Sequence, residues 1–308
     1  MEVTTLSLLA LFIGSSIRLA IPLLLGALGE LVSERAGVLN LSLEGMMLLG
    51  AFAGAMGSLA TGSPLLGLLI AVIAVVPLAL LQAVLSVTLH ANQIVSGIGL
   101  NILVLGSTTV LYREVIGGRS RVQIPGFEKF HPPFLSDIPI IGPAVFVQSW
   151  MVYLAFALAF CIWVVMKFTS FGLAIHAAGV EPKALDKSGG SVVKVRYSAI
   201  MFTGVMAALG GAFLSLSDIN TFTEGMTNGV GYLAIVGVIF GNWKVWRTVF
   251  ACVFIGAVTA LQFQLPAMGI NVPNALLIML PYVMALFAVA GLMGRQTPPR
   301  DLTLPYFL

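Results

Sequence analysis

A series of nine apolar runs limits the fold of this chain more than any other feature. A helix needs about 20 apolar residues to cross the hydrocarbon core of a bilayer, and most of the runs reach that length. Only 9% of the residues are charged, against about 25% in soluble domains, so lipid is the main solvent of the chain. The runs lie near residues 6–28, 37–60, 65–89, 93–112, 149–168, 194–217, 229–241, 246–265 and 273–293. We therefore predict an all-α polytopic transmembrane helix bundle of nine spans, within a range of eight to ten, and a single transmembrane domain over residues 1–308.

Two of these runs have special features. The first follows only Met1 to Thr5, without the basic residues or the small-residue cleavage site of a signal peptide, so we expect a retained span. The seventh, residues 229–241, is short and rich in glycine. Such a run is typical of a broken or re-entrant span.

Basic residues indicate the side of the membrane on which each loop lies, because cytoplasmic loops retain Lys and Arg. Nine spans with an external N-terminus place ten basic residues in the cytoplasm and four outside, with Arg18 within a span. The cytoplasmic set is Arg35, Lys167, Lys183, Lys187, Lys194, Arg196, Lys244, Arg247, Arg295 and Arg300. The external set is Arg113, Arg119, Arg121 and Lys129. This bias predicts a cytoplasmic C-terminus.

Two polar loops stand out. The external loop, residues 113–148, is rich in Pro and Gly and cannot form one regular helix. It is either a solvated connector or a docking surface for an external partner. In the cytoplasmic loop, residues 167–196, Pro182 suits a first helical turn and Gly189 a left-handed stop, so we predict a short helix over Pro182 to Ser188 between glycine hinges. On spacing alone this helix is an interfacial linker or a surface that a partner approaches closely.

Two ionisable residues fall within predicted spans, where a charge needs a partner or water. Arg18 lies ten residues from the inner end of the first span, and Glu44 seven residues from the inner start of the second. At 1.5 Å per residue these positions correspond to depths of roughly 15 and 10 Å. We therefore predict that Arg18 and Glu44 interact, or that Glu44 caps a helix break at Gly45.

Neutral polar residues also recur within the spans. Gln93, Gly97 and Asn101 are spaced by four, which places two amides and a glycine on one helix face. Asn40, Ser42, Thr227 and Asn228 supply further hydrogen-bonding groups. Such groups suit the pathway of a polar uncharged solute, and they also suit hydrogen bonds between helices, which are common in membrane bundles.

Motifs of ATP-binding and hydrolytic sites are missing from the sequence, which argues against an enzymatic function. It contains no G-x-x-x-x-G-K-[ST] phosphate loop, no H-E-x-x-H and no G-x-S-x-G. Cys161 and Cys252 are isolated within spans and support neither a disulfide nor a metal site. We therefore expect a non-catalytic transport chain that binds no cofactor itself and has the lipid bilayer, not nucleic acid, as its surroundings.

Several motifs along the chain carry a family resemblance. The stretches Glu34 to Asn40, Glu44 to Met47 and Asn92 to Gly97 resemble the permease subunits of bacterial ABC importers in the branched-chain amino acid, ribose and nucleoside superfamily. Residues 171–182 are similar to the family's coupling-helix region, residues 225–243 to its second-half motif, and residues 280–282 to its last span. The match is closest to the nucleoside or simple-sugar branch.

This resemblance implies a complete transport assembly. Its parts would be a cytoplasmic ABC ATPase that holds ATP and Mg, a second and different permease chain, and a periplasmic or lipoprotein substrate-binding protein, all at a bacterial inner membrane. Residues 182–188 would be the coupling helix, and the coupling residues are Gly179, Glu181, Pro182, Lys183, Ala184, Leu185, Ser188 and Gly189. The pathway residues are Asn40, Ser42, Glu44, Gln93, Asn101, Thr227 and Asn228. Import of a simple sugar such as ribose or galactose and an ion-coupled secondary transporter stay open as alternatives to nucleoside import.

Overall fold

The computed structural model describes residues 5–117, 122–133, 136, 138, 141–268, 272–289 and 297–307. All regular elements within these ranges are helices, which confirms the predicted all-α bundle. The α-helices are α1 (Thr5–Arg35), α2 (Leu43–Thr61), α3 (Pro64–Ala83), α4 (Gln93–Ile116), α5 (Trp150–Phe168), α6 (Ser170–Val180), α7 (Pro182–Lys187), α8 (Val192–Phe213), α9 (Val230–Phe240), α10 (Val245–Ala267) and α11 (Asn274–Val289). Three π-helical turns accompany them, of which Val84–Thr88 extends α3, Leu214–Asp218 extends α8 and Gly142–Phe146 precedes α5.

Seven helices of the described chain have the length and apolar composition needed to cross a membrane. They are α1, α2, α3, α4, α5, α8 and α10, with the π-helical turns included for α3 and α8. The other two predicted spans form the shorter helices α9 and α11. At 1.5 Å per residue the 11 residues of α9 rise about 16 Å, roughly half of the hydrocarbon thickness. The prediction of a broken seventh run is therefore confirmed.

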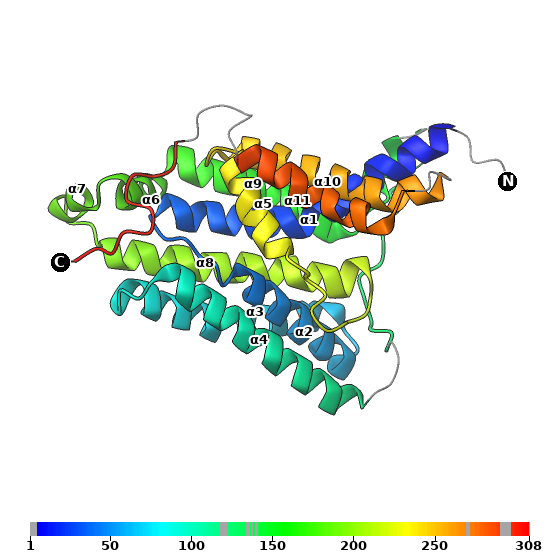
Figure 1. Ribbon diagram of the computed structural model, residues 1–308, viewed down its shortest axis with the longest axis horizontal. Coiled ribbons are helices and arrows are strands. Elements are labelled where there is room, and N and C mark those ends of the chain that lie inside the picture. The colour runs from blue at the N-terminus through cyan, green and yellow to red at the C-terminus, as the bar shows by residue number, and fades with distance from the viewer. Residues whose placement is uncertain are drawn as a thin grey trace.

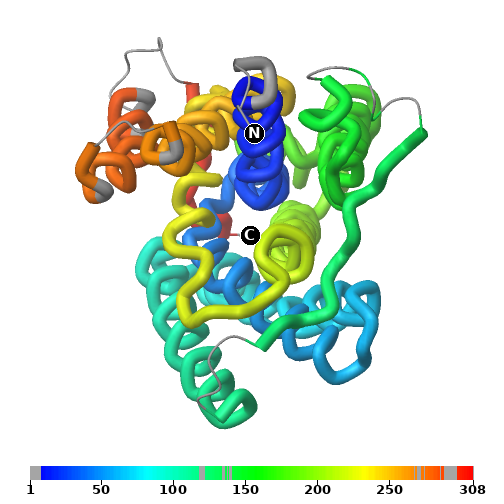
Figure 2. Tube along the Cα trace, turned by 90° about the vertical axis from the view of Figure 1, so that its right-hand side faces the viewer, coloured from blue at the N-terminus to red at the C-terminus, as the bar shows by residue number. Residues whose placement is uncertain are grey.

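Helix α1 forms the centre of the bundle. Its residues 20–34 are all buried, and most of them are apolar, with Glu30, Ser33 and Glu34 as the exceptions. It packs against α8, α9 and α10, and Figure 2 shows it between α10 and α8. Helices α2 and α8 also pack closely, because small residues on both let their backbones approach. Gly50 of α2, for example, lies directly against the backbone of Ala208 in α8.

Two crossings of the bundle are interrupted by irregular backbone. Residues 36–42 leave the end of α1 and turn back beside it. The hydrogen bond from the Asn40 N–H to Oε1 of Glu30, at 2.8 Å, places this segment next to α1. The chain becomes helical again at Leu43, the first residue of α2. Residues 219–229 follow the end of α8 in the same manner and precede α9. Both α2 and α9 therefore begin inside the bundle.

Figure 1 shows the helices running along the long axis of the molecule. Helix α7 and the C-terminal residues lie at one end, which we call the α7 end, and the N-terminus lies at the other, the N-terminal end. The basic residues predicted to share the cytoplasmic side gather at the α7 end, around two cavities there and along α7 and the start of α8. Arg113 lies in the last turn of α4, and Lys129 lines a cavity with Ala10 and Arg18 from the first half of α1. Arg119, Arg121 and Arg295 lie outside the described residues.

Both predicted loops have the expected local structure where they are described. Residues 122–132 of the external loop are irregular and are held to the end of α8, where the Phe127 N–H donates to the Leu216 carbonyl at 2.7 Å. In the second loop Pro182 opens the six-residue helix α7, Ser188 ends it, and Gly189 follows with φ +84°. The short helix between glycines is confirmed, and its proline and glycine have the conformational roles assigned to them.

Candidate functional site

The Glu44 carboxylate joins the two interrupted crossings. Its Oε1 accepts hydrogen bonds from the Thr227 hydroxyl at 2.6 Å and the Gly229 N–H at 2.9 Å, and its Oε2 accepts from the Gly231 N–H at 2.7 Å. Gly229 is the N-cap of α9, has φ +84° and offers no side chain. An anion at a helix N-terminus satisfies unpaired donors and the helix dipole together. Glu44 therefore supplies, from α2, the cap that α9 lacks.

Asn101 of α4 caps the N-terminus of α2 in the same way. The N-cap residue Ser42 makes no side-chain cap of its own, and the Gly45 N–H instead donates to Oδ1 of Asn101 at 2.8 Å. The Asn101 amide also donates to the Leu41 carbonyl and to the Tyr232 hydroxyl, each at 2.8 Å. One side chain of α4 thus holds the irregular segment, the start of α2 and a residue of α9 together.

The predicted polar face of α4 is confirmed, and it faces residues 36–45. Gln93 Oε1 accepts from the Leu39 N–H at 2.9 Å. A Cβ on Gly97 would lie 2.7 Å from Cβ of Leu41 and 2.9 Å from backbone atoms of Leu41 and Ser42, so glycine lets the irregular segment lie against the helix. The side chains of this face form hydrogen bonds with backbone groups that would otherwise be unpaired, and such groups must be paired inside a bilayer.

The seven predicted pathway residues divide into two groups. Glu44, Asn101, Thr227 and Asn228 line a cavity of about 360 Å³ between α2, α4 and the start of α9. Asn40, Ser42 and Gln93 do not line it. The Asn40 side chain accepts from the Ser42 hydroxyl at 2.6 Å within the irregular segment, which both residues stabilise.

The cavity combines polar and apolar walls. Leu48, Leu105 and the ring of Tyr232 supply apolar surface, and Tyr232 is 39% exposed. A carboxylate has about four acceptor positions, and three of those on Glu44 are used by the contacts above. The Tyr232 hydroxyl accepts from Asn101, so its own proton is available toward the cavity. The site therefore offers at least one acceptor and one donor beside an aromatic face.

The predicted pairing of Arg18 with Glu44 is wrong. Arg18 Nε lies 3.0 Å from Oδ1 of Asp218, at the end of the π-helical turn that extends α8. The error comes from assuming that both spans are continuous from the inner face. Asn40 lies level with Glu30, so Arg18, twelve residues earlier, is about 18 Å farther along α1. Glu44 caps α9 and not a break at Gly45.

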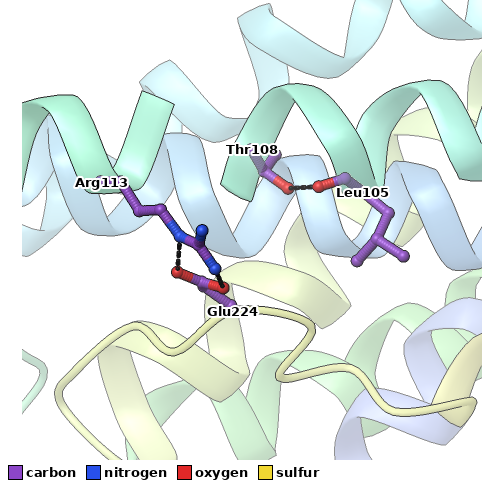
Figure 3. A network of polar contacts seen from close by, with 4 residues as sticks. All are labelled: Leu105, Thr108, Arg113 and Glu224. Atoms are coloured by element: carbon purple, nitrogen blue, oxygen red, sulfur yellow. Dashed lines mark hydrogen bonds and ion pairs between the residues drawn. The ribbon is translucent and has the colours of Figure 1, made fainter. Parts of the chain in front are cut away.

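An exposed ion pair connects α4 to the segment before α9. Figure 3 shows Arg113 and Glu224 pointing toward each other, with Arg113 Nε and Nη2 donating to the two carboxylate oxygens at 2.8 and 2.9 Å. This hydrogen bonding lowers the pKa of Glu224, which lies in the loop and outside the spanning helices. Leu105, also drawn in Figure 3, and Gly225 next to Glu224 both line the cavity. The pair therefore holds the two walls of the cavity together at the N-terminal end.

A second junction lies at the α7 end and centres on Arg196. Its side chain is 3% exposed and donates to the carbonyls of Ala36 at 3.2 Å, Leu304 at 2.9 Å and Ala178 at 3.4 Å. It thereby ties the turn after α1, the C-terminal segment and α6 to the start of α8. The Asp301 N–H also donates to the Gly179 carbonyl at 2.9 Å.

The predicted coupling residues surround this junction. Gly179 is buried, and a Cβ there would lie 2.2 Å from the Arg35 carbonyl, so α6 touches the turn that leads into residues 36–42. Pro182 and Leu185 face inward, whereas Lys183 and Ala184 are exposed. Glu181, Ser188 and Gly189 are exposed at the two ends of α7. The helix thus presents a free surface at the tip of the α7 end.

Sequence reasoning missed several residues of these junctions. In the sequence Tyr232 is an isolated aromatic, Asp218 lies just beyond the predicted sixth span, and Arg196 is one of the predicted cytoplasmic charges. A usable signal exists for Arg196, which is the second basic residue after the serine N-cap Ser191 and lies at the start of an apolar run. No local signal identified Tyr232, whose partner is 131 residues away.

Comparisons with known proteins agree with this architecture. Residues 12–289 match the family model described as the permease component of the branched-chain amino acid transport system. A guanosine ABC transporter permease protein of Bacillus subtilis, NupQ, is 34% identical over 97% of both chains. A nucleoside ABC transporter permease protein of Lactococcus lactis, NupC, is 30% identical over 91% of both.

A further relative and a solved structure extend the comparison. A putative glucose ABC transporter permease protein of Haloferax volcanii, TsgC13, is 35% identical over 88% of this chain and 82% of its own. Among solved structures, PsaBC from Streptococcus pneumoniae, in complex with Fab, superposes with a TM-score of 0.50 at 10% identity, over 92% of this chain and 91% of that one. At this identity the superposition concerns the fold alone.

Proposed function

Since the chain belongs to the family of permease components of branched-chain amino acid transport systems, we propose that it is the membrane-spanning permease subunit of an ABC importer for nucleosides. The observation that carries the proposal is the cavity at the Glu44 junction. Polar groups in a bilayer mark solute pathways, and broken helices place such groups at mid-membrane in transporters. Here two helix N-termini meet the side chains of Glu44, Asn101, Thr227 and Tyr232 at one cavity.

The chemistry of the cavity suits an uncharged solute with a ring. Glu44 and the Tyr232 hydroxyl offer an acceptor and a donor to ribose hydroxyls, and the exposed Tyr232 ring offers a stacking surface to a base. The names of the guanosine and nucleoside permease relatives support the same solute class. We assign Glu44, Asn101, Thr227 and Asn228 to the pathway wall, and Asn40, Ser42 and Gln93 to the support of that wall.

The second part of the proposal concerns coupling to ATP hydrolysis. A cytoplasmic ABC ATPase, which holds ATP and Mg, would bind the exposed face of α7, and this chain would be non-catalytic. Motion of α7 would pass through the contact of Gly179 with Arg35 into residues 36–42 and so to Glu44. The α7 end would be cytoplasmic, because the basic residues gather there. A second, different permease chain and a periplasmic or lipoprotein binding protein would complete the importer in a bacterial inner membrane.

Uptake of labelled guanosine and uridine tests the solute. Cells would express the chain with its ATPase, partner permease and binding protein, and excess ribose, galactose or leucine would serve as competitors. We expect ATPase-dependent nucleoside uptake that resists these competitors. Sugar uptake without nucleoside uptake would transfer the chain to the sugar branch, and uptake without the ATPase would point to an ion-coupled transporter.

Coupling is tested separately with Ala184→Trp, which places a large ring on the exposed face of α7 and leaves the inward-facing Leu185 in place. We expect the chain to fold and insert normally while the ATPase no longer co-purifies with it. Normal co-purification and uptake in this variant would refute the assignment of α7.

A simple sugar is the second candidate solute. The glucose permease relative favours it, because its identity to this chain is 35%, against 34% for the guanosine permease relative, although over a smaller share of the two chains. Hydroxyl groups of a sugar would use the same donor and acceptor. Only the base distinguishes the two solutes, so Tyr232→Leu is informative. It would weaken nucleoside uptake by about tenfold if a base stacks there, and it would alter sugar uptake little.

A further inference from the structure

A cavity of about 700 Å³ lies at the α7 end, away from the Glu44 junction, between α5, α6 and the start of α10. Its lining contains five side chains that are basic or titrate as bases and no carboxylate. They are Arg35, Lys167, His176, Lys244 and Arg247. Electrostatics alone therefore favours an anionic occupant.

These positive charges lack acidic partners in the described part of the chain. The two ion pairs found there use Arg18 and Arg113. The Lys167 ammonium lies 5.3 Å from the ring centre of Trp163 and 5.1 Å from that of Phe168, so two cation–π contacts hold it at the cavity without neutralising its charge. Lys244 and Arg247 are exposed.

Arg35 and His176 form a pre-arranged pair at the edge of the cavity. Arg35 donates through Nε and Nη2 to the Trp243 carbonyl, at 2.8 and 2.5 Å, and its Nη1 lies 3.1 Å from Nδ1 of His176. Since Arg can only donate, His176 accepts at Nδ1 and carries its proton on Nε2. Partial burial and the Arg35 charge lower the pKa of His176, which lies in α6 and outside the spanning helices. Its Nε2–H is then a neutral donor toward the cavity.

The remaining walls are apolar or aromatic. Trp163 and Trp246 approach with ring centres 6.3 Å apart, and Leu31, Met166 and Leu173 lie beside them. The spanning helix α5 ends here at Phe168 and α10 begins at Val245, so the cavity lies at the level where spanning helices leave the membrane. Trp with Lys and Arg at that level is typical of the membrane–water interface. Basic pockets between such helices bind anionic lipid head groups.

We propose that this cavity binds the head group of an anionic phospholipid, with the phosphate held by Lys167, Lys244 and Arg247 and the upper acyl chains lying against the Trp163 and Trp246 rings. The site goes beyond the transport activity and needs only the membrane location of the chain. Bound lipid would fill the space between α5 and α10 and brace α6, which leads directly into α7.

The tryptophans themselves provide the measurement. Three of the four in the sequence, Trp163, Trp243 and Trp246, line the cavity. The purified full chain would be reconstituted in phosphatidylcholine vesicles, and tryptophan fluorescence followed as brominated phosphatidylglycerol or brominated phosphatidylcholine is added. We expect phosphatidylglycerol to quench with an apparent affinity about fivefold to tenfold higher, because each basic residue near the surface attracts an anionic lipid.

A matched pair of triple variants tests the residues. Lys167→Gln/Lys244→Gln/Arg247→Gln should lose the preference for phosphatidylglycerol. Lys183→Gln/Lys187→Gln/Lys194→Gln removes the same charge at the same end of the molecule but outside the cavity, and it should retain the preference. Unchanged quenching by brominated phosphatidylcholine shows that each variant is folded and inserted.

Four outcomes would overturn the proposal. They are equal quenching by the two lipids, a preference that survives the first triple variant, full competition by inorganic phosphate, and loss of the preference when the ATPase is bound. The third would indicate a site for free phosphate, and the fourth a docking surface for the ATPase. None of these measurements uses a transported solute, so failure here leaves the nucleoside proposal intact, and failed uptake leaves this one intact.

Discussion

Glu44 and Arg196 are ionisable residues at two junctions of the same membrane bundle, and they serve opposite ends of helices. Glu44 accepts from N–H groups at the start of α9. Arg196 donates to carbonyls, at Ala36 just after the end of α1 and at Ala178 near the end of α6. Unpaired backbone groups at helix termini attract the opposite charge, and the helix dipole reinforces this choice. Each residue thus carries the charge that is favourable at the helix end it contacts.

The two junctions differ in their surroundings. The Arg196 side chain is 3% exposed although it borders a cavity at the α7 end, and all its hydrogen bonds go to backbone carbonyls. Glu44 borders a cavity and retains an unused acceptor position. Arg196 is buried and hydrogen-bonds only to backbone, so it supports the structure, whereas Glu44 is half-buried and can exchange partners through its unused acceptor position. We therefore expect stability to dominate the response to mutation at Arg196, and transport to respond more strongly at Glu44.

The largest effect on stability is expected for Arg196→Met, which preserves much of the side-chain volume but removes every donor. Three carbonyls, two of them buried, would lose a charged partner, and the free energy of unfolding should fall by about 3 kcal/mol. Thermal unfolding of the purified chain in detergent measures the loss. Lys194→Met, an exposed change two residues away, is the control and should alter stability by less than about 0.5 kcal/mol. Similar values for the two would contradict the structural role.

Glu44→Gln should reduce stability less than Arg196→Met does, and it should reduce uptake more. The amide retains one acceptor oxygen but presents an NH₂ group to an N–H donor, so the free energy of unfolding should fall by about 2 kcal/mol. Uptake normalised to the amount of inserted protein should fall further than stability accounts for. Glu114→Gln, at an exposed position on α4, is the matched control. Normal uptake by Glu44→Gln would remove the carboxylate from the pathway.

A pair of glycine variants sharpens the comparison from the α4 side. Gly97→Ala should destabilise the chain by about 2 kcal/mol, because its Cβ would press on the backbone of residues 41–42. Gly99→Ala lies on the same helix with nothing within 4 Å and should stabilise the chain by about 0.5–1 kcal/mol. Chemical denaturation of both variants in mild detergent shows whether each free energy of unfolding falls or rises. If both variants were stabilised, α4 would not pack on the irregular segment as described.

The smallest effect is expected at the exposed Arg113–Glu224 pair. Its hydrogen bonds lower the pKa of Glu224 below the ordinary value of 4.5. A lowered carboxyl pKa contributes stability above the unfolded-state pKa and loses it as the pH falls through the folded-state value. The contribution should therefore be constant near neutral pH and disappear in acid below pH 4.5. The difference in melting temperature between wild type and Glu224→Gln, followed from pH 7 to acid, measures it, and a difference that grows in acid would contradict this sign.

The parts of this molecule that depend on nearby residues could be predicted. Runs of apolar residues predicted the helices, the short glycine-rich run predicted the half-length α9, and Pro182 with Gly189 predicted α7. Spacing by four predicted the face of Gln93, Gly97 and Asn101. In each case the signal lies within a few turns of one helix, where period and propensity act.

The partners of the charged residues were decided by tertiary structure. Glu44 and Thr227 are 183 residues apart, and Arg196 and Ala36 are 160 apart. Depth along continuous helices suggested Arg18 for Glu44, but residues 36–42 are irregular, so Arg18 meets Asp218 and Glu44 meets α9. The sequence by itself determined that the chain fills a bilayer with helices and where most of them begin and end, since hydropathy and helix signals are local. Only the tertiary structure decided which helix ends meet which charges, because that depends on how the interrupted crossings pack around α1.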